Sequence, residues 1–247
     1  MIKYETNRSF SISLKFLYAI KMHFLDHVES IHKARNEIKI LHNDTHEFVV
    51  KSFRVPNLIN KMVYGFFRQS KAEKSYEYAI KIGEFTPKPI AYIEFKKFFL
   101  LYESYFISEH FIYDFTIREP LLKRDFINKD KIFKAFAYFT QQLHEQGIYH
   151  LDYSPGNILI QNNNGQYIFK IVDINRMQFK KLDLEARLKN FAKLWAKDED
   201  LAIIISEYAK LVKEDEALCL SIALKYSHAH KARINAKKRR RGQAVVD

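Results

Sequence analysis

The residues best suited to chemistry form a spaced set in the second half of the sequence. Asp152 lies two residues after His150 and five residues before Asn157, and Asp173 lies 16 residues after Asn157. Phosphoryl transfer requires an acceptor for the proton of the attacking hydroxyl and oxygen ligands that hold Mg²⁺ against the phosphates of ATP. Asp152 suits the first role, whereas Asn157 and Asp173 suit the second. The spacing therefore predicts a phosphotransferase site that uses ATP and Mg²⁺.

The surroundings of these residues favour that interpretation over the ordinary one, in which an aspartate caps a helix or forms a turn. A helical pattern ends at Gly147 just before the loop, and Pro155-Gly156 can turn Asn157 back towards the same site. His150 is interpreted as a structural hydrogen-bonding residue of the loop rather than as a base. Arg176 is a further candidate for contact with phosphate or substrate.

The N-terminal half contains a candidate cation for the phosphates. Lys51 follows two valines in a strand pattern, from which an ammonium group can reach the α- and β-phosphates of ATP. The alternative is a strand lysine that faces water. The next helical segment offers two acidic partners, Glu73 and Glu77, which lie one turn apart. We prefer Glu77 because Gly83 and the next strand follow it closely, and we expect Glu73 to be a solvated helix charge.

Periodicity and turn residues place these side chains on elements. The first half is β-rich, and from Asn128 onwards helical patterns dominate. An Asn-Asn-Asn-Gly turn between two strands delivers Asp173. The predicted strands are 36–41, 47–53, an extended run at 86–95, an apolar and therefore buried strand at 96–106, and two short strands within 158–174. The predicted helices are 59–82, 128–146 with Asn128 as its cap, 184–195 and 201–224.

Composition limits the class of protein. The chain has 247 residues, of which 47% are hydrophobic, so it can bury a sizeable core. Cys219 is the only cysteine, which excludes a disulfide framework, and neither a CxxC zinc motif nor a GxxxxGK[ST] loop occurs. The longest apolar runs have five residues, too short to cross a bilayer, and no signal peptide is indicated. We expect a cytoplasmic protein.

The net charge of +12 is concentrated near the C-terminal end. A segment from Lys231 to Arg241 contains seven basic residues and no acidic one. Such a tail can bind an anionic membrane surface or another polyanion, and the alternative is a solvated, frayed end. We do not expect a nucleic-acid partner. The basic residues are Lys231, Arg233, Lys237, Lys238, Arg239, Arg240 and Arg241.

Several short segments of the sequence resemble those of the bacterial lipopolysaccharide core kinases, which phosphorylate heptose or Kdo sugars of the inner core. The resemblance covers about residues 28–195 and extends more broadly to the protein-kinase-like fold. It is carried by VVKSFR at 49–54, SKAEKSYEY at 70–78, TPKPIAY at 86–92, LHEQGIYHLDYSPGNILI at 143–160 and VDINRM at 172–177.

The resemblance implies an α+β, protein-kinase-like two-lobed fold. Residues 1–104 would form a small antiparallel β-lobe with one helix, and residues 105–230 a reduced, mostly helical lobe that holds the catalytic and metal-binding loops. Residues 231–247 would be the basic tail. It also implies that adenine bonds the backbone around Glu103–Tyr105, with Tyr102 at the back of the pocket.

The sequence departs from protein kinases in informative ways. Ser30–Asn36 stands where a glycine-rich phosphate loop is expected but contains no glycine, so the side chains of Lys33, Arg35 or Asn36 would replace some backbone contacts. Leu151 stands where protein kinases have an arginine, and Asp173-Ile174-Asn175 stands where they have Asp-Phe-Gly. The Ala-Pro-Glu sequence of protein kinases does not follow. Only 74 residues remain after Asp173. A small or lipid-linked acceptor is therefore favoured over a protein.

The leading hypothesis is a kinase of a sugar hydroxyl in the lipopolysaccharide core, with Lys51 paired to Glu77 and a lipid-linked sugar as partner. Such a protein would work in the cytoplasm, where it could bind peripherally at the inner face of the inner membrane. One alternative is a kinase of another small molecule or of protein, as in aminoglycoside- or RIO-like branches. Another is a pseudokinase scaffold whose basic tail binds a polyanion.

Overall fold

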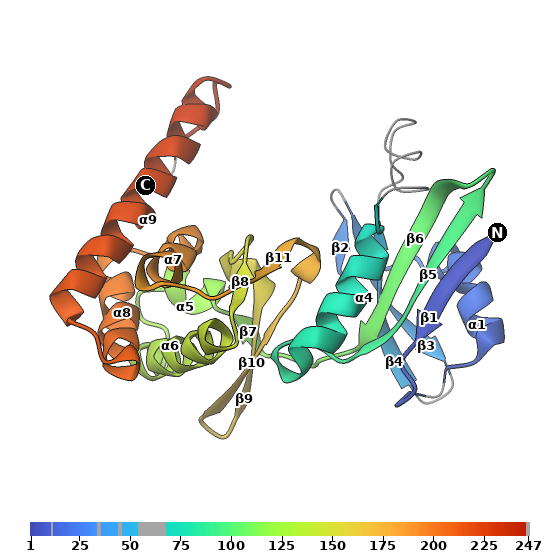
Figure 1. Ribbon diagram of the computed structural model, residues 1–247, viewed down its shortest axis with the longest axis horizontal. Coiled ribbons are helices and arrows are strands. Elements are labelled where there is room, and N and C mark those ends of the chain that lie inside the picture. The colour runs from blue at the N-terminus through green and yellow to red at the C-terminus, as the bar shows by residue number, and fades with distance from the viewer. Residues whose placement is uncertain (11, 34–35, 44–45, 54–67, 246–247) are drawn as a thin grey trace. The chain divides into compact units, whose positions relative to one another are not determined.

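The computed structural model describes residues 1–245 apart from 11, 34–35, 44–45 and 54–67. The chain divides into two compact units, Met1–Ile112 and Tyr113–Asp247, and each is described by itself (Figure 1). Among the described residues, no helix is long and apolar enough to cross a membrane.

The first unit is built on an antiparallel sheet of six strands in the order β1-β5-β6-β4-β3-β2. Helices α1 and α2 cover one face of the sheet, and α4 covers the other. The elements are β1 (Ile2–Thr6), α1 (Leu14–Tyr18), α2 (Ile20–Asp26), β2 (His32–Lys33), β3 (Glu37–Asn43), β4 (His46–Phe53), α4 (Lys71–Ile82), the short 3₁₀ turn η1 (Gly83–Phe85), β5 (Pro89–Lys97) and β6 (Leu100–Glu109).

Side-chain alternation along β4 decides which face each residue serves. Phe48 and Val50 pack into the core under α1 and α2, whereas Phe53 packs with Ala72 and Tyr76 of α4. Successive strand residues point to opposite faces of a sheet. Lys51, two residues before Phe53, therefore lies on the α4 face.

The predicted strands 36–41 and 47–53 are confirmed as β3 and β4. Of the predicted helix 59–82, residues 71–82 are confirmed as α4, and residues 59–67 lie outside the described part of the chain. Ser70 begins this helix, because its hydroxyl accepts a hydrogen bond from the backbone N–H of Glu73 at 3.1 Å. Strand β1 and helices α1 and α2 were not predicted.

The predicted buried strand at 96–106 is confirmed from Leu100 onwards as part of β6, but its start at 96–99 is wrong. The chain reverses at Phe98 and Phe99, which have φ angles of +49° and +62°, and Lys97 then pairs with Leu100 across the turn. Both phenylalanines are exposed. Their apolar character suggested burial in a strand, but they form the exposed turn of the β5–β6 hairpin.

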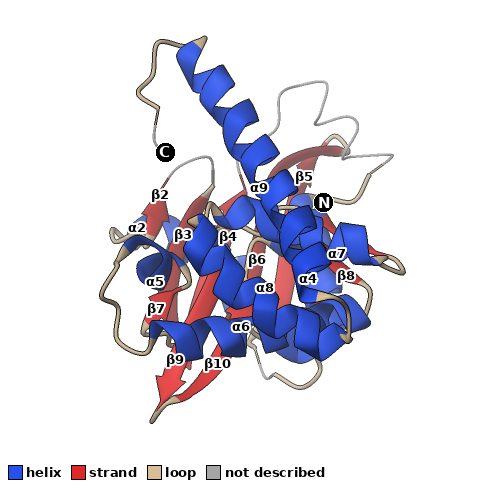
Figure 2. Ribbon diagram, turned by 90° about the vertical axis from the view of Figure 1, so that its left-hand side faces the viewer, coloured by secondary structure: helices blue, strands red, loops and turns tan. Residues whose placement is uncertain are grey.

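The second unit is mostly helical, and α6 packs against α8 (Figure 2). Its strands form a three-stranded sheet, β10-β9-β7, and a two-stranded one, β11-β8. The elements are β7 (Phe115–Thr116), α5 (Arg118–Leu122), α6 (Lys129–Glu145), β8 (Ile148–His150), η2 (Pro155–Asn157), β9 (Ile158–Asn163), β10 (Gln166–Ile171), η3 (Ile174–Arg176), β11 (Met177–Phe179), α7 (Leu184–Asn190), η4 (Phe191–Leu194), α8 (Asp198–Val212) and α9 (Glu216–Arg239).

The apolar stripe predicted for the 128–146 helix is confirmed as the buried face of α6. Its members Ile132, Phe133, Phe136, Phe139 and Leu143 all lie in the core. Asn128 occupies the predicted N-cap position in a left-handed conformation, but its side chain makes no capping hydrogen bond.

The C-terminal helices differ from the prediction in two ways. The predicted helix 201–224 is broken where Lys213 adopts a left-handed conformation, and Asp215 then caps α9 by accepting a hydrogen bond from the Leu218 N–H. The basic segment is no simple frayed end, because α9 continues to Arg239.

The two units meet in sequence after Ile112, later than the expected boundary at residue 104. Strand β6 runs on to Glu109 and pairs with β4 on one side and β5 on the other. The first unit therefore keeps the whole strand.

Candidate active site

The loop that carries Asp152 is fixed at its start by a close backbone contact. Gly147 follows α6 with a φ of +67°, and a side chain there would come within 2.7 Å of the Lys180 carbonyl oxygen. The Lys180 N–H in turn bonds the Gly147 carbonyl at 2.9 Å. Only glycine combines this conformation with this approach. This contact fixes the direction in which the chain leaves α6, and strand β8 then pairs with β11.

His150 joins the loop to the segment before Asp173. Its Nδ1 accepts a hydrogen bond from the Asp152 N–H at 3.0 Å, so its Nε2 carries the proton that bonds the Val172 carbonyl at 3.0 Å. Burial lowers the pKa of His150, which keeps the ring neutral near pH 7. These contacts give His150 the structural role expected from the sequence.

Asp152, Asn157 and Asp173 lie close together in the second unit. The Asn157 side-chain amide donates to the Asp152 carbonyl at 2.9 Å, and the Asn157 carbonyl accepts from the Val172 N–H at 2.9 Å. Val172 is followed directly by Asp173, whose Oδ1 accepts a hydrogen bond from the Asn175 side chain at 2.7 Å. The two halves of the predicted motif are therefore tied together through backbone atoms.

Gly156 allows a cation to approach this loop. A side chain at this position would come within 2.7 Å of the guanidinium group of Arg118, which extends from α5. The glycine of the Pro155-Gly156 pair thus makes room as well as forming the turn.

The oxygen atoms of Asn157 and Asp173 suit a hard cation. Because the Asn157 amide nitrogen is engaged, its side-chain oxygen is the atom available as a ligand. Within the described ranges, no group of three or more His, Cys, Asp or Glu side chains is placed to hold a metal. Mg²⁺ commonly takes one or two carboxylates together with water and substrate phosphates, and this donor set fits that pattern.

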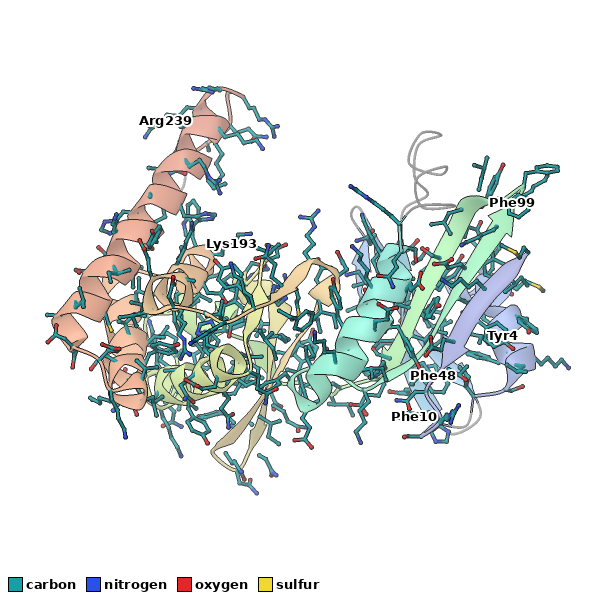
Figure 3. All side chains as sticks on the ribbon, viewed as in Figure 1. Tyr4, Phe10, Phe48, Phe99, Lys193 and Arg239 are labelled. Atoms are coloured by element: carbon teal, nitrogen blue, oxygen red, sulfur yellow. The ribbon has the colours of Figure 1, made fainter. Side chains whose placement is uncertain are left out.

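Sequence reasoning missed Lys193. Lys193 lies on η4 (Figure 3). Its ammonium group donates to the Leu151 carbonyl and lies 3.6 Å from Asp152 Oδ1. The two residues are 41 positions apart, so motif spacing gives no sign of the contact. Asn190 and Lys193 are three residues apart, and both contact the segment from His150 to Asp152.

A buried polar chain supports the loop from behind. Asn190 donates to the His150 carbonyl at 2.9 Å, and its oxygen accepts from His144 Nε2 at 3.1 Å. His144 Nδ1 therefore accepts from the Tyr208 hydroxyl, at 2.7 Å. Burial lowers the pKa of His144 to about 4, so the ring is neutral at pH 7.

In the first unit, Lys51 lies in the middle of β4, and its ammonium group is 5.4 Å from the centre of the Phe53 ring. The expectation that Glu73 is a solvated charge is wrong. Glu73 is buried in the first turn of α4, and its carboxylate contacts Lys3 of β1 at 2.5 Å. Glu77 is partly buried and accepts a hydrogen bond from Gln69 at 2.6 Å.

The expected adenine contacts at 103–105 are contradicted by the sheet. Tyr105 pairs with Ser52 of β4 and Ile93 of β5, so the backbone here is an inner strand whose polar groups serve the ladder. The Glu103 carboxylate instead binds Lys21 at 2.7 Å, and the Tyr105 ring packs on Phe24. Tyr102 lies on the half of β6 nearer the hairpin turn, with its side chain partly exposed.

Of the residues 30–36 predicted for the phosphate loop, His32 and Lys33 form strand β2. Strand β2 pairs with β3, and Asn36 lies in the connection between them. Arg35 falls outside the described residues, as does the side chain of Lys33.

Comparison with known proteins identifies the family and a similar fold. Residues 81–214 match the model of the family described as "Lipopolysaccharide kinase (Kdo/WaaP) family". A comparison with curated proteins finds no match. Among solved structures, "WaaP in complex with acyl carrier protein" is similar with a TM-score of 0.57 and 14% identity, covering 92% of this chain and 99% of that chain. The family match includes Asp152, Asn157, Asp173 and Lys193, and the structural likeness supports the two-lobed α+β fold.

Proposed function

The chain belongs to the lipopolysaccharide kinase (Kdo/WaaP) family, and on that premise we propose that it transfers a phosphoryl group from ATP to a sugar hydroxyl of the lipopolysaccharide inner core. The observation that carries the proposal is the link from Asp152 through Asn157 to Val172, which gathers a proton acceptor and two oxygen ligands. The reaction would take place at the cytoplasmic face of the inner membrane, where both ATP and a lipid-linked acceptor are accessible.

In this proposal each residue of the loop has one role. Asp152 orients the sugar hydroxyl and accepts its proton as the hydroxyl oxygen bonds to the γ-phosphorus and ADP leaves. Asn157 and Asp173 would hold Mg²⁺, which neutralises charge on the phosphates when bound. Most of the rate would come from positioning and electrostatics.

The first unit would supply the phosphate contacts. Lys51 is the proposed cation for the α- and β-phosphates. Because Lys3 occupies Glu73, Glu77 remains the acidic partner that we propose for Lys51. We do not assign adenine binding to the 103–105 backbone, because its polar groups already pair with the neighbouring strands of the sheet.

The direct test is the Asp152→Asn variant, assayed with labelled ATP and extracted lipooligosaccharide. Turnover should fall roughly 10²- to 10⁴-fold while ATP binding is retained, because the variant loses the proton acceptor but keeps the shape of the side chain. Asp125→Asn, at an exposed position in the same unit, is the matched control and should keep full activity. Equal turnover in the Asp152→Asn variant would exclude the proposed role.

Two further measurements separate the alternative functions. Residues 30–36 contain no glycine, and this favours a pseudokinase scaffold, since the usual backbone cradle for phosphates is missing. Titration of the protein with ATP and Mg²⁺, followed calorimetrically, should show binding if it is a kinase. Mass spectrometry of glycolipid from cells with and without the protein would then distinguish the core sugar from another acceptor.

A further inference from the structure

Helices α1 and α2 are apolar on two sides. Phe16, Leu17, Ile20 and Phe24 pack into the core of the first unit. The other apolar side chains of these helices are exposed, and they recur every three or four residues as a stripe: Leu14, Tyr18, Met22 and Leu25. A helix that lies on a sheet needs only one apolar face, so the second face calls for a partner of its own.

A second apolar feature lies at the turn of the β5–β6 hairpin. Phe98 and Phe99 are 81% and 63% exposed, and the ammonium group of Lys97 lies 5.8 Å from the centre of the Phe98 ring. Figure 3 shows Phe99 at the tip of the hairpin. Aromatic rings at a protruding turn remain in contact with water unless another surface covers them.

Contacts within the first unit connect these two features. Tyr4 of β1 meets Tyr18 edge to face, with ring centres 5.4 Å apart. Ile2 of the same strand pairs with Phe95, near the hairpin turn, and Lys21 of α2 binds Glu103 on the other hairpin strand at 2.7 Å. The stripe, the exposed side of β1 and the hairpin tip together form what we call the apolar end surface.

Basic residues lie among the apolar ones. Lys15 of α1 and Lys97 of the hairpin are exposed, as is Lys21 of α2, which pairs with Glu103. Rings and aliphatic side chains interspersed with lysine are the composition that inserts into the interfacial layer of an anionic bilayer. The protruding turn also suits insertion between headgroups better than contact with a flat protein surface.

We propose that the apolar end surface docks the protein on a lipid bilayer that contains anionic headgroups. The choice of a bilayer over a second copy or a protein rests on the proposed function, because the acceptor of that reaction is itself held in a membrane. The hydrophobic side chains provide the attachment, and the lysines add attraction to the headgroups.

The test uses the full chain and vesicles of phosphatidylcholine with and without phosphatidylglycerol, with binding measured by co-sedimentation. Phe98→Asn/Phe99→Asn should lower the partition coefficient at least about tenfold, since asparagine tolerates the backbone of the turn but removes both rings. Met22→Gln/Leu25→Gln should do the same. The matched control is Leu122→Gln/Ile127→Gln, two equally exposed apolar side chains of the second unit, and it should bind like the wild type.

Several results would overturn the proposal: no vesicle binding by the wild type, equal binding by the apolar variants, or a dimer in light scattering that these variants dissociate. Vesicle binding needs neither nucleotide nor acceptor, so its failure is distinct from failure of the kinase proposal. All these variants should phosphorylate a soluble, delipidated core oligosaccharide at the wild-type rate.

Discussion

Asp152 and Lys193 carry opposite charges and lie close together at the loop that follows β8. Both are about one third exposed, and their closest charged atoms are 3.6 Å apart. Lys193 also holds the Leu151 carbonyl, so one ammonium group fixes the backbone beside Asp152 and places a positive charge next to its carboxylate. In the proposed reaction this contact would hold the Asp152 carboxylate in position, which makes Lys193 a positioning residue.

We expect Lys193→Met to lower kcat roughly 10- to 100-fold with little change in the KM for ATP, because the lysine acts through Asp152 and not on nucleotide binding. Lys193→Arg should restore part of the rate, which a purely space-filling role would not explain. Steady-state kinetics with varied ATP provides the measurement.

Lys189→Met is the control for this prediction. Lys189 is exposed on the preceding helix α7, and its ammonium group lies over the Tyr226 ring. Its replacement should leave kcat unchanged. A Lys193→Met enzyme with wild-type kcat would remove Lys193 from the site.

At the scale of elements, the catalytic loop depends on three helices behind it. The chain of hydrogen bonds from Tyr208 of α8 through His144 of α6 to Asn190 of α7 ends at the His150 carbonyl. Its geometry requires a neutral His144, whose ring must accept at one nitrogen and donate at the other. The nearby Arg187–Glu145 pair has opposing effects on the His144 pKa, and burial is the larger cause of its shift.

The hydrogen bonds through His144 predict that the folded protein loses stability in acid. The pKa of His144 is about 4 in the folded protein against 6.5 when solvated, so the unfolded chain binds more protons between these values. The contribution is complete above about pH 6.5 and lost as the pH falls towards 4, amounting to about 3 kcal/mol of unfolding free energy. Urea denaturation at several pH values measures it.

The His144→Gln variant should be less stable than the wild type at pH 7. Its unfolding free energy should depend less on pH between about 6.5 and 4. The control is His228→Gln, because His228 is exposed and pairs with Asp198 on the surface. If the pH dependence of the His144→Gln variant matched that of the wild type, another group would be responsible, and the buried His150, whose pKa shifts in the same direction, would be examined next.

For the whole molecule, the excess positive charge is partly built into a helix. Within the basic segment, Lys231 donates to the Ala196 carbonyl at 2.7 Å, Asn235 is buried and Lys238 lies over the Trp195 ring. A truncation at Lys231 would therefore damage the second unit. Charge replacement is the cleaner experiment, and the exposed basic residues are Arg233, Lys237, Arg239, Arg240 and Arg241.

Replacing the last four of these residues with glutamine should lower the salt concentration at which the protein elutes from a heparin column, because clustered positive charge attracts polyanions. Kinase activity on a soluble acceptor should be unchanged. A control variant replaces Lys123, Arg124, Lys131 and Lys134, which are exposed elsewhere in the second unit. Identical elution of the two variants would show that only net charge matters.

Local patterns account for what the sequence could predict. The catalytic loop, the β9–β10 hairpin and the buried face of α6 each depend on residues close in the chain. The errors involve distant partners or untypical turns. Glu73 is buried because Lys3, 70 residues earlier, comes to it on β1, and Phe98-Phe99 forms a turn without any of the usual turn residues. Lys193 reaches Asp152 only through the packing of η4.

The backbone at Asp173 has a consequence for how such a gene can change. Its φ of +57° lies in the left-handed region, where glycine and asparagine are the replacements tolerated best. In the genetic code, both are a single base change away from aspartate. A lineage can thus lose the proposed metal-binding carboxylate through one mutation while keeping the loop conformation. Copies that retain the fold but have lost the chemistry are therefore easily reached, and this position is the one to inspect for them.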